Sequence, residues 1–98
     1  MTESWLRCKV SQGQFSIEYA VSGKRFDGEG FSLFAPKEFV DTPEEVTDET
    51  VDGWLRVEIL DQKGDLLLIR LPRPTLESGQ SLTVNSVDVK KRLVRQKA

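Results

Sequence analysis

The stretch that decides the fold runs from residue 54 to residue 71 and reads WLRVEILDQKGDLLLIRL. In its first half Leu55, Val57 and Ile59 alternate with other residues, so these apolar side chains would share one face of a β-strand. A polar segment follows, and its Gly64 can adopt the left-handed backbone conformation that favours a tight turn or a bulge. The pattern therefore predicts a β-hairpin, the strongest in the chain.

The second half of this hairpin is apolar at nearly every position. Residues 66–71 are interrupted only by Arg70, and Pro72 ends the run because proline has no N–H for the hydrogen-bond ladder. A strand that is apolar on both faces is typical of the centre of a sheet. We expect residues 66–71 to form a central strand that is covered on both sides.

A second hairpin is predicted near the N-terminus. Residues 6–10 alternate between apolar and charged side chains, residues 11–14 are polar with one glycine, and residues 15–21 alternate again. Phe15 and Ile17 fall on the apolar face of the last segment. We therefore expect both side chains to pack into the core.

Weaker signals complete the pattern. Residues 31–35 have the composition of a short strand that ends at Pro36, and a further strand begins at Leu82. The alternation changes phase near Asn85, which indicates a bulge or a switch to helix. Beyond it we expect a strand to about Leu93 and then a frayed end, with a short helix as the alternative.

Residues 38–52 are acidic and show no strand alternation. Within them Thr42, Pro43 and Glu45 have the spacing of a helix N-terminus, which predicts one short helical turn in this acidic segment. The chain as a whole is predicted to be a single all-β domain, residues 1–98. Its expected architecture is a small antiparallel sandwich or barrel of about six or seven strands, and periodicity does not separate the two.

The composition excludes several classes of reaction. The 98 residues include one cysteine, Cys8, and no histidine. Histidine-based triads, imidazole acid–base chemistry, histidine-ligated metals and paired thiolates are therefore excluded. A domain of this size also has little room for a cleft that tunes a pair of carboxylates. We expect a protein without enzymatic activity, cofactor or bound metal.

The expected location is the cytoplasm. Residues 1–7 are polar and charged and lack the apolar core of a signal peptide, and no apolar run approaches the length of a membrane span. The chain has 38% hydrophobic and 31% charged residues with a net charge of −2, which places it in the soluble globular class. No membrane partner is expected.

The acidic segment is the first candidate for a binding surface. Between Glu38 and Asp52 there are seven carboxylates and no basic side chain. Such a run is usually a solvated loop, but it would also suit a basic partner protein. A calcium-binding loop fits poorly, because Ile59 stands where a bidentate glutamate would be needed. The candidate contact residues are Glu44, Glu45, Asp48 and Glu49.

The basic C-terminal segment is the second candidate, since no acid follows Asp88. Such a segment keeps a chain soluble, docks on an acidic protein surface, or binds the phosphates of nucleic acid. It could also pair with the acidic segment, either within one chain or in a second copy. The residues concerned are Lys90, Lys91, Arg92 and Arg95.

A third candidate lies in the glycine-rich loop between residues 22 and 30. Basic and aromatic side chains are adjacent here, which would suit a contact loop, although most such loops are ordinary connections. A phosphate-binding loop is excluded, because the Gly-Lys-Ser/Thr ending and a following helix are both lacking. The candidate contact residues are Lys24, Arg25 and Phe26.

The sequence thus favours a non-enzymatic protein–protein interaction module, with an accessory or regulatory role and a small β scaffold. The alternative is a small β-barrel that binds single-stranded nucleic acid through its basic C-terminal segment. The expected partner is another protein, nucleic acid comes second, and a homo-oligomer is left open. An exposed apolar patch would favour an accessory role in a larger assembly.

Overall fold

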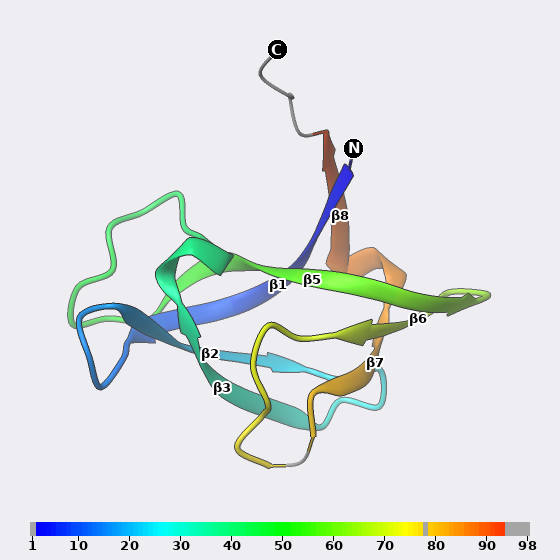
Figure 1. Ribbon diagram of the computed structural model, residues 1–98, viewed down its shortest axis with the longest axis horizontal. Coiled ribbons are helices and arrows are strands. Elements are labelled where there is room, and N and C mark those ends of the chain that lie inside the picture. Colours follow the sequence, from blue (N-terminus) through cyan, green and yellow to red (C-terminus); the bar gives the residue numbers. More distant parts are fainter. Residues whose placement is uncertain (1, 78, 94–98) are drawn as a thin grey trace.

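The computed structural model describes residues 2–77 and 79–93, and its regular secondary structure is almost entirely β-strand (Figure 1). Two single 3₁₀ turns, η1 (Lys37–Phe39) and η2 (Ser86–Asp88), interrupt the strands. No helix in this part of the chain is long and apolar enough to cross a lipid bilayer. The strands are β1 (Thr2–Gln12), β2 (Glu18–Lys24), β3 (Gly30–Pro36), β4 (Val40–Asp41), β5 (Val51–Lys63), β6 (Leu66–Arg70), β7 (Ser81–Asn85) and β8 (Val89–Leu93).

All the strand pairs are antiparallel, and the main path of the sheet is β3-β2-β1-β5-β6-β7. The long strand β1 changes its second partner along its length. Its residues 9–12 pair with β2, whereas residues 2–6 pair with β8. The sheet therefore curls into a half-barrel at one end, while β8 and the start of β1 extend away from it (Figure 1).

The half-barrel has two edges, β3 and β7, which loops bridge in place of strand pairing. The N–H of Phe26 donates to the carbonyl of Thr83 on β7 at 2.9 Å, and the N–H of Leu76 donates to the carbonyl of Ser32 on β3 at 2.8 Å. These bonds satisfy backbone groups that an open edge would leave unpaired. The architecture is thus a partly open barrel, which decides between the two alternatives that periodicity left.

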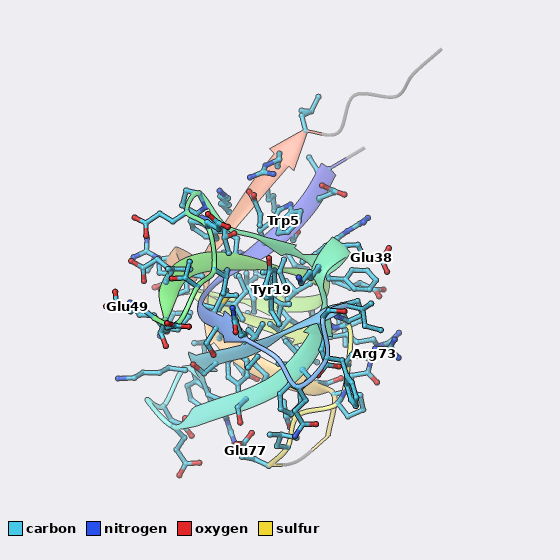
Figure 2. All side chains as sticks on the ribbon, turned by 90° about the vertical axis from the view of Figure 1, so that its left-hand side faces the viewer. Trp5, Tyr19, Glu38, Glu49, Arg73 and Glu77 are labelled. Carbon is cyan, nitrogen blue, oxygen red and sulfur yellow. The ribbon has the colours of Figure 1, made fainter. Side chains whose placement is uncertain are left out.

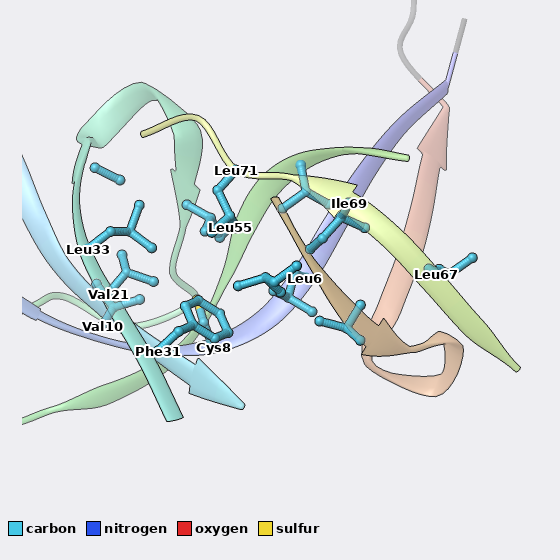
Figure 3. Packing of buried hydrophobic residues seen from close by; sticks show 14 residues of the cluster. Leu6, Cys8, Val10, Val21, Phe31, Leu33, Leu55, Leu67, Ile69 and Leu71 are labelled. Atoms are coloured by element: carbon cyan, nitrogen blue, oxygen red, sulfur yellow. The ribbon is translucent and has the colours of Figure 1, made fainter. Parts of the chain in front are cut away.

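The hydrophobic core lies inside the curled sheet, as Figure 3 shows. Alternate residues of each strand point inward, as the two-residue period of a strand requires. Leu55 and Ile69 are fully buried. The other buried members are Leu6, Cys8, Val10, Val21, Phe31, Leu33, Ala35, Val57, Leu67, Leu71, Leu82 and Val84.

The predicted hairpin of residues 54–71 is confirmed as β5 and β6. Gly64 has a φ of 60°, the left-handed conformation that was expected of the turn. The register moves from Ile59↔Ile69 to Asp61↔Leu68, so a bulge also interrupts the pair. β6 lies between β5 and β7, as expected, but the expected cover on both faces is wrong, because Leu68 is 39% exposed. A half-barrel of one layer has a single inner face to cover.

The N-terminal hairpin is confirmed, but its turn is longer than expected. The last pair of β1 and β2 is Gln12↔Tyr19, and the N–H of Glu18 donates to the carbonyl of Phe15 within the turn. The prediction that Phe15 and Ile17 are buried is wrong, since they are 66% and 75% exposed. The alternation of side chains does not indicate where the ladder of backbone hydrogen bonds stops. The strand predicted from it therefore included residues that belong to the turn.

The helical turn expected at residues 42–45 is absent, and these residues are irregular. A helical turn does occur at the start of the acidic segment, where η1 includes Glu38 and Phe39. The reason is that residues 43–50 contain a single large apolar side chain, Val46, besides Pro43. A helix there would have no apolar face to bury, and packing provides most of the stability of a short helix.

The change of phase near Asn85 is explained by η2, which separates β7 from β8. β8 ends at Leu93, so the predicted strand in this region is confirmed and the helical alternative is wrong over 89–93. The frayed end that was predicted beyond it lies in residues 94–98, outside the described residues. The two-residue β4 is the element that no sequence pattern indicated.

A carboxylate satisfies polar groups at the edge of β3. Glu77 accepts hydrogen bonds from both the N–H and the hydroxyl of Ser32, each at 2.7 Å. These bonds favour the ionised carboxylate, and the hydroxyl bond is the largest of the causes that hold the pKa of Glu77 below its ordinary value. Glu77 lies beside β3 at the lower edge of the view in Figure 2.

The first prediction concerns the pH dependence of this contact. A carboxylate with a lowered pKa in the folded state stabilises the fold above the pKa of the unfolded chain, and this contribution is lost as pH falls through the folded pKa. Glu77→Ala should therefore lower the free energy of unfolding at neutral pH, and the difference from wild type should shrink on acidification. Urea unfolding of both proteins at several pH values measures this difference in unfolding free energy. Ser32→Ala should reproduce part of the loss, and a difference that does not change with pH would contradict the prediction.

The second prediction concerns the core. Leu55→Ala should cost about 2–5 kcal/mol of unfolding free energy, because it leaves a cavity beneath the central strand pair. Leu68→Ala removes the same atoms from the outer face of β6 and should cost less than about 1 kcal/mol. Chemical denaturation of both variants measures the contrast. Equal losses would mean that the outer face of β6 is packed as tightly as the core.

Candidate functional site

The acidic loop, residues 42–50, connects β4 to β5 and forms the most strongly negative part of the surface. Val46 is half-buried and packs against the core, so the loop is held near its middle. The predicted contact residues Glu44, Glu45, Asp48 and Glu49 are all exposed, and the described part of the chain provides no ion-pair partner for them. In Figure 2 Glu49 projects from one side of the molecule.

The acids that flank this loop are engaged. Asp41 accepts a hydrogen bond from the guanidinium of Arg92 at 2.7 Å, and Asp52 pairs with the ammonium of Lys9. The bond from Lys9, and then its charge, lower the pKa of Asp52. The two carboxylates that flank the acidic loop are therefore neutralised, and those within the loop are left free.

The acidic loop joins β5 near Gly53, where the backbone packs closely against neighbouring strands. A Cβ atom at Gly53 would lie 2.7 Å from a methyl carbon of Val10 and 3.0 Å from the carbonyl oxygen of Asp41. Only glycine allows β5 to approach the end of β4 this closely. Gly53 thus fixes the place from which the acidic loop leaves the sheet.

The third prediction follows from this contact. Gly53→Ala should lower the free energy of unfolding by about 1–3 kcal/mol and loosen the loop, because backbone atoms must move to accept the methyl group. Unfolding by denaturant and cleavage by a glutamate-specific protease measure the two effects. Gly30→Ala is the matched control, since its Cβ would meet only one atom, at 3.8 Å. Unchanged cleavage in Gly53→Ala would contradict the prediction.

The basic C-terminal residues fold back on their own chain. Arg92 lies 5.1 Å from the ring centre of Trp5 in addition to its bond with Asp41, and Lys90 lies 4.0 Å from the ring centre of Trp54. Lys91 alternates to the other face of β8 and is exposed. Arg95 lies outside the described residues. The contact of Arg92 with Asp41 is thus the pairing within one chain that was one of the alternatives.

The glycine-rich loop uses part of its charge locally. Arg25 forms ion pairs with Asp27 at 3.6 Å and with Glu29 at 3.9 Å. Phe26 is 43% exposed, and its backbone ties the loop to β7. Lys24 ends β2 and points away from this loop, onto the outer face of the sheet beside β1. The structure therefore separates Lys24 from Arg25 and Phe26.

A surface that sequence reasoning missed lies between the β1–β2 turn and the acidic loop. These two segments are side by side in Figure 1, and a cleft of about 450 Å³ lies between them. The lining includes Phe15 from the turn, Tyr19 from β2, and Glu45 and Val46 from the acidic loop. The only signal in the sequence was the glycine at position 13, which did not show how far the turn extends.

A second missed site is a cleft of about 520 Å³ on the outer face of β1, which we call the cationic cleft. Arg7 and Lys9 of β1, Lys24 of β2 and Trp54 of β5 line it, with Asp88 at its rim. The register explains the convergence, because Arg7 is opposite Trp54 and Lys9 is opposite both Asp52 and Ser22. These residues are dispersed along the chain, so no local motif grouped them, and Lys24 alone was predicted, as part of the glycine-rich contact loop.

A third cleft, of about 610 Å³, lies near the start of β1 and is neutral. Its charged side chains pair with one another, with Arg56 3.2 Å from Glu3 and Arg70 3.8 Å from Glu58. Elsewhere, burial raises the pKa of the Cys8 thiol to about 12, so the thiol is protonated at neutral pH. Within residues 2–77 and 79–93, no group of three potential ligands is placed to hold a metal ion. Comparisons with protein-family models, curated proteins and solved structures find no match for this chain.

Proposed function

We propose that this protein is a non-enzymatic interaction module that binds a basic partner protein. Its docking surface consists of the β1–β2 turn and the acidic loop, with Phe15, Ile17, Glu44, Glu45, Asp48 and Glu49 as the contact residues. The observation that carries the proposal is the exposure of Phe15 and Ile17, 66% and 75%, on a turn whose Phe15 lines the same cleft as the unpaired carboxylate of Glu45. Paired large apolar side chains on a surface turn are typical of interaction sites.

The apolar pair supplies the binding energy in this proposal. Complete burial of an aromatic or branched side chain contributes about 1.5–3 kcal/mol, and a few such anchors dominate most interfaces. Phe15 and Ile17 extend from a turn whose ends are held by the last pair of β1 and β2. A partner would therefore meet two anchors in a fixed position and lose little entropy in ordering them.

The carboxylates supply selectivity. Each exposed ion pair contributes at most about 1 kcal/mol, so the acidic loop alone would bind weakly. A negative rim around an apolar anchor instead speeds association with a basic surface and disfavours an acidic one. The partner in this proposal carries an apolar pocket surrounded by lysine or arginine.

Nucleic-acid binding through the basic C-terminal segment is the weaker proposal. Among the basic residues assigned to that role, Lys90 lies on Trp54, Arg92 bonds to Asp41, and Lys91 faces the other way. Binding of phosphates would have to replace the contacts of the first two. We therefore place the primary function on the acidic side of the molecule.

The fourth prediction tests this surface. Phe15→Ala with Ile17→Ala should weaken capture of partner proteins from the source organism by about 100-fold, because truncation of each anchor costs about 1–2 kcal/mol or more. Glu44→Gln with Glu45→Gln should weaken it less, and mainly at low salt. Quantitative affinity capture, followed by titration of the captured protein, measures both effects.

Matched controls exist elsewhere on the surface. Leu76→Ala with Val87→Ala removes two side chains that are 65% and 79% exposed, and Asp61→Asn with Asp65→Asn removes two exposed carboxylates at the β5–β6 hairpin. Both control variants should bind as wild type. Capture that survives in the two test variants would show that the partner uses another surface.

A further inference from the structure

We infer that the cationic cleft is a binding site for a nucleotide, either free or as one unit of a single strand. This site is separate from the docking surface and does not depend on the proposed function. The inference rests on three cations from three different strands, none of which has a carboxylate partner in the described chain. Arg7 of β1 and Lys90 of β8 contact the Trp54 ring, and Lys24 of β2 lines the same cleft.

The first step of the argument is charge. Lys9 is paired with Asp52, whereas in the described chain no carboxylate oxygen lies within ion-pairing distance of Arg7, Lys24 or Lys90. Like charges held together repel one another, and an anion relieves that repulsion. The charge of Arg7 also contributes to the lowered pKa of Asp52. The outer face of β1 is therefore positive where the cleft opens.

The second step is the ring. Arg7 and Lys90 lie 5.7 Å and 4.0 Å from the ring centre of Trp54, which is half-buried and forms part of the cleft. A partly exposed cation–π contact contributes about 0.5–1 kcal/mol, less than a charge-assisted hydrogen bond to phosphate. Lys90 would therefore leave the ring for a phosphate, and the indole would become free to stack on a base.

The third step concerns Asp88, the carboxylate of the cleft other than Asp52. Asp88 lines the cleft at the end of η2, just before β8, and it would repel a simple anion such as inorganic phosphate. A carboxylate accepts hydrogen bonds, and a nucleotide carries donors in its sugar hydroxyls and in some base amino groups. A ligand with an anionic end, a flat ring and hydrogen-bond donors would engage the cations, the indole ring and Asp88 together. The volume of about 520 Å³ lies within the usual range for small-ligand sites.

The test is NMR titration of the full chain with adenosine monophosphate, inorganic phosphate and a short oligoadenylate strand. Adenosine monophosphate should shift the signals of Arg7, Lys24 and Trp54 and bind at least about tenfold more tightly than inorganic phosphate. Tighter binding of the strand than of the mononucleotide, with a steep dependence on salt, would identify a single strand as the source. Equal affinity would identify the free nucleotide.

Variants separate this site from a general surface effect. Arg7→Ala and Lys24→Ala should each weaken nucleotide binding by about tenfold, while Arg73→Ala, a basic residue remote from the cleft, should not. Asp88→Asn should reduce the preference for the nucleotide over inorganic phosphate. Trp54→Phe should retain binding better than Trp54→Leu, because only phenylalanine preserves a ring to stack on.

Three results would overturn the inference. They are an absence of shifts in the cleft at millimolar nucleotide, equal binding of inorganic phosphate and nucleotide, and wild-type affinity in Arg7→Ala and Lys24→Ala. None of them bears on the docking surface, whose test uses Phe15, Ile17, Glu44 and Glu45. Failure of one proposal is therefore distinguishable from failure of the other.

Discussion

The pairing of β1 with β5 is the interaction on which the rest of the structure depends. Residues 4–10 pair with residues 51–57, which places Leu6 opposite Leu55 inside the half-barrel and Arg7 opposite Trp54 outside it. Both strands extend beyond this pair and take up further partners, so one register orients the core, the acidic loop and the cationic cleft. A shift by one residue would reverse every side chain and place the charges in the core.

Local signals made part of this fold predictable from sequence. The hairpin of β5 and β6 combines alternation with a glycine at the turn, and both lie within one short stretch. The position of Phe15 was not predictable in this way, because the end of a ladder depends on the register between two strands. Leu68 was misjudged for a related reason: a strand that is apolar on both faces reveals its hydrophobicity but not how many layers cover it.

The functional surfaces were likewise predictable where local sequence decides them and not where strand register does. The exposure of the acidic loop followed from its composition, since carboxylates in such number cannot be buried without partners. The pairing of Arg92 with Asp41 did not follow, because the sequence offered several acids and several bases and no register between them. The cationic cleft needed three strands to be placed before its residues became neighbours, and the same pairing separated Lys24 from Arg25, which the sequence had grouped together.

The change of partners along β1 has a consequence for the way the chain assembles. The C-terminal part of β1 can pair with β2 soon after both are synthesised. The other edge of β1 must wait for β5, and the N-terminal residues of β1 must wait for β8, which is synthesised last of the strands. Contacts so distant in sequence raise the contact order and slow folding. During translation Trp5 and Leu6 therefore lack their β8 partners until residues 89–93 have left the ribosome, and the start of β1 presents one unpaired edge throughout that interval.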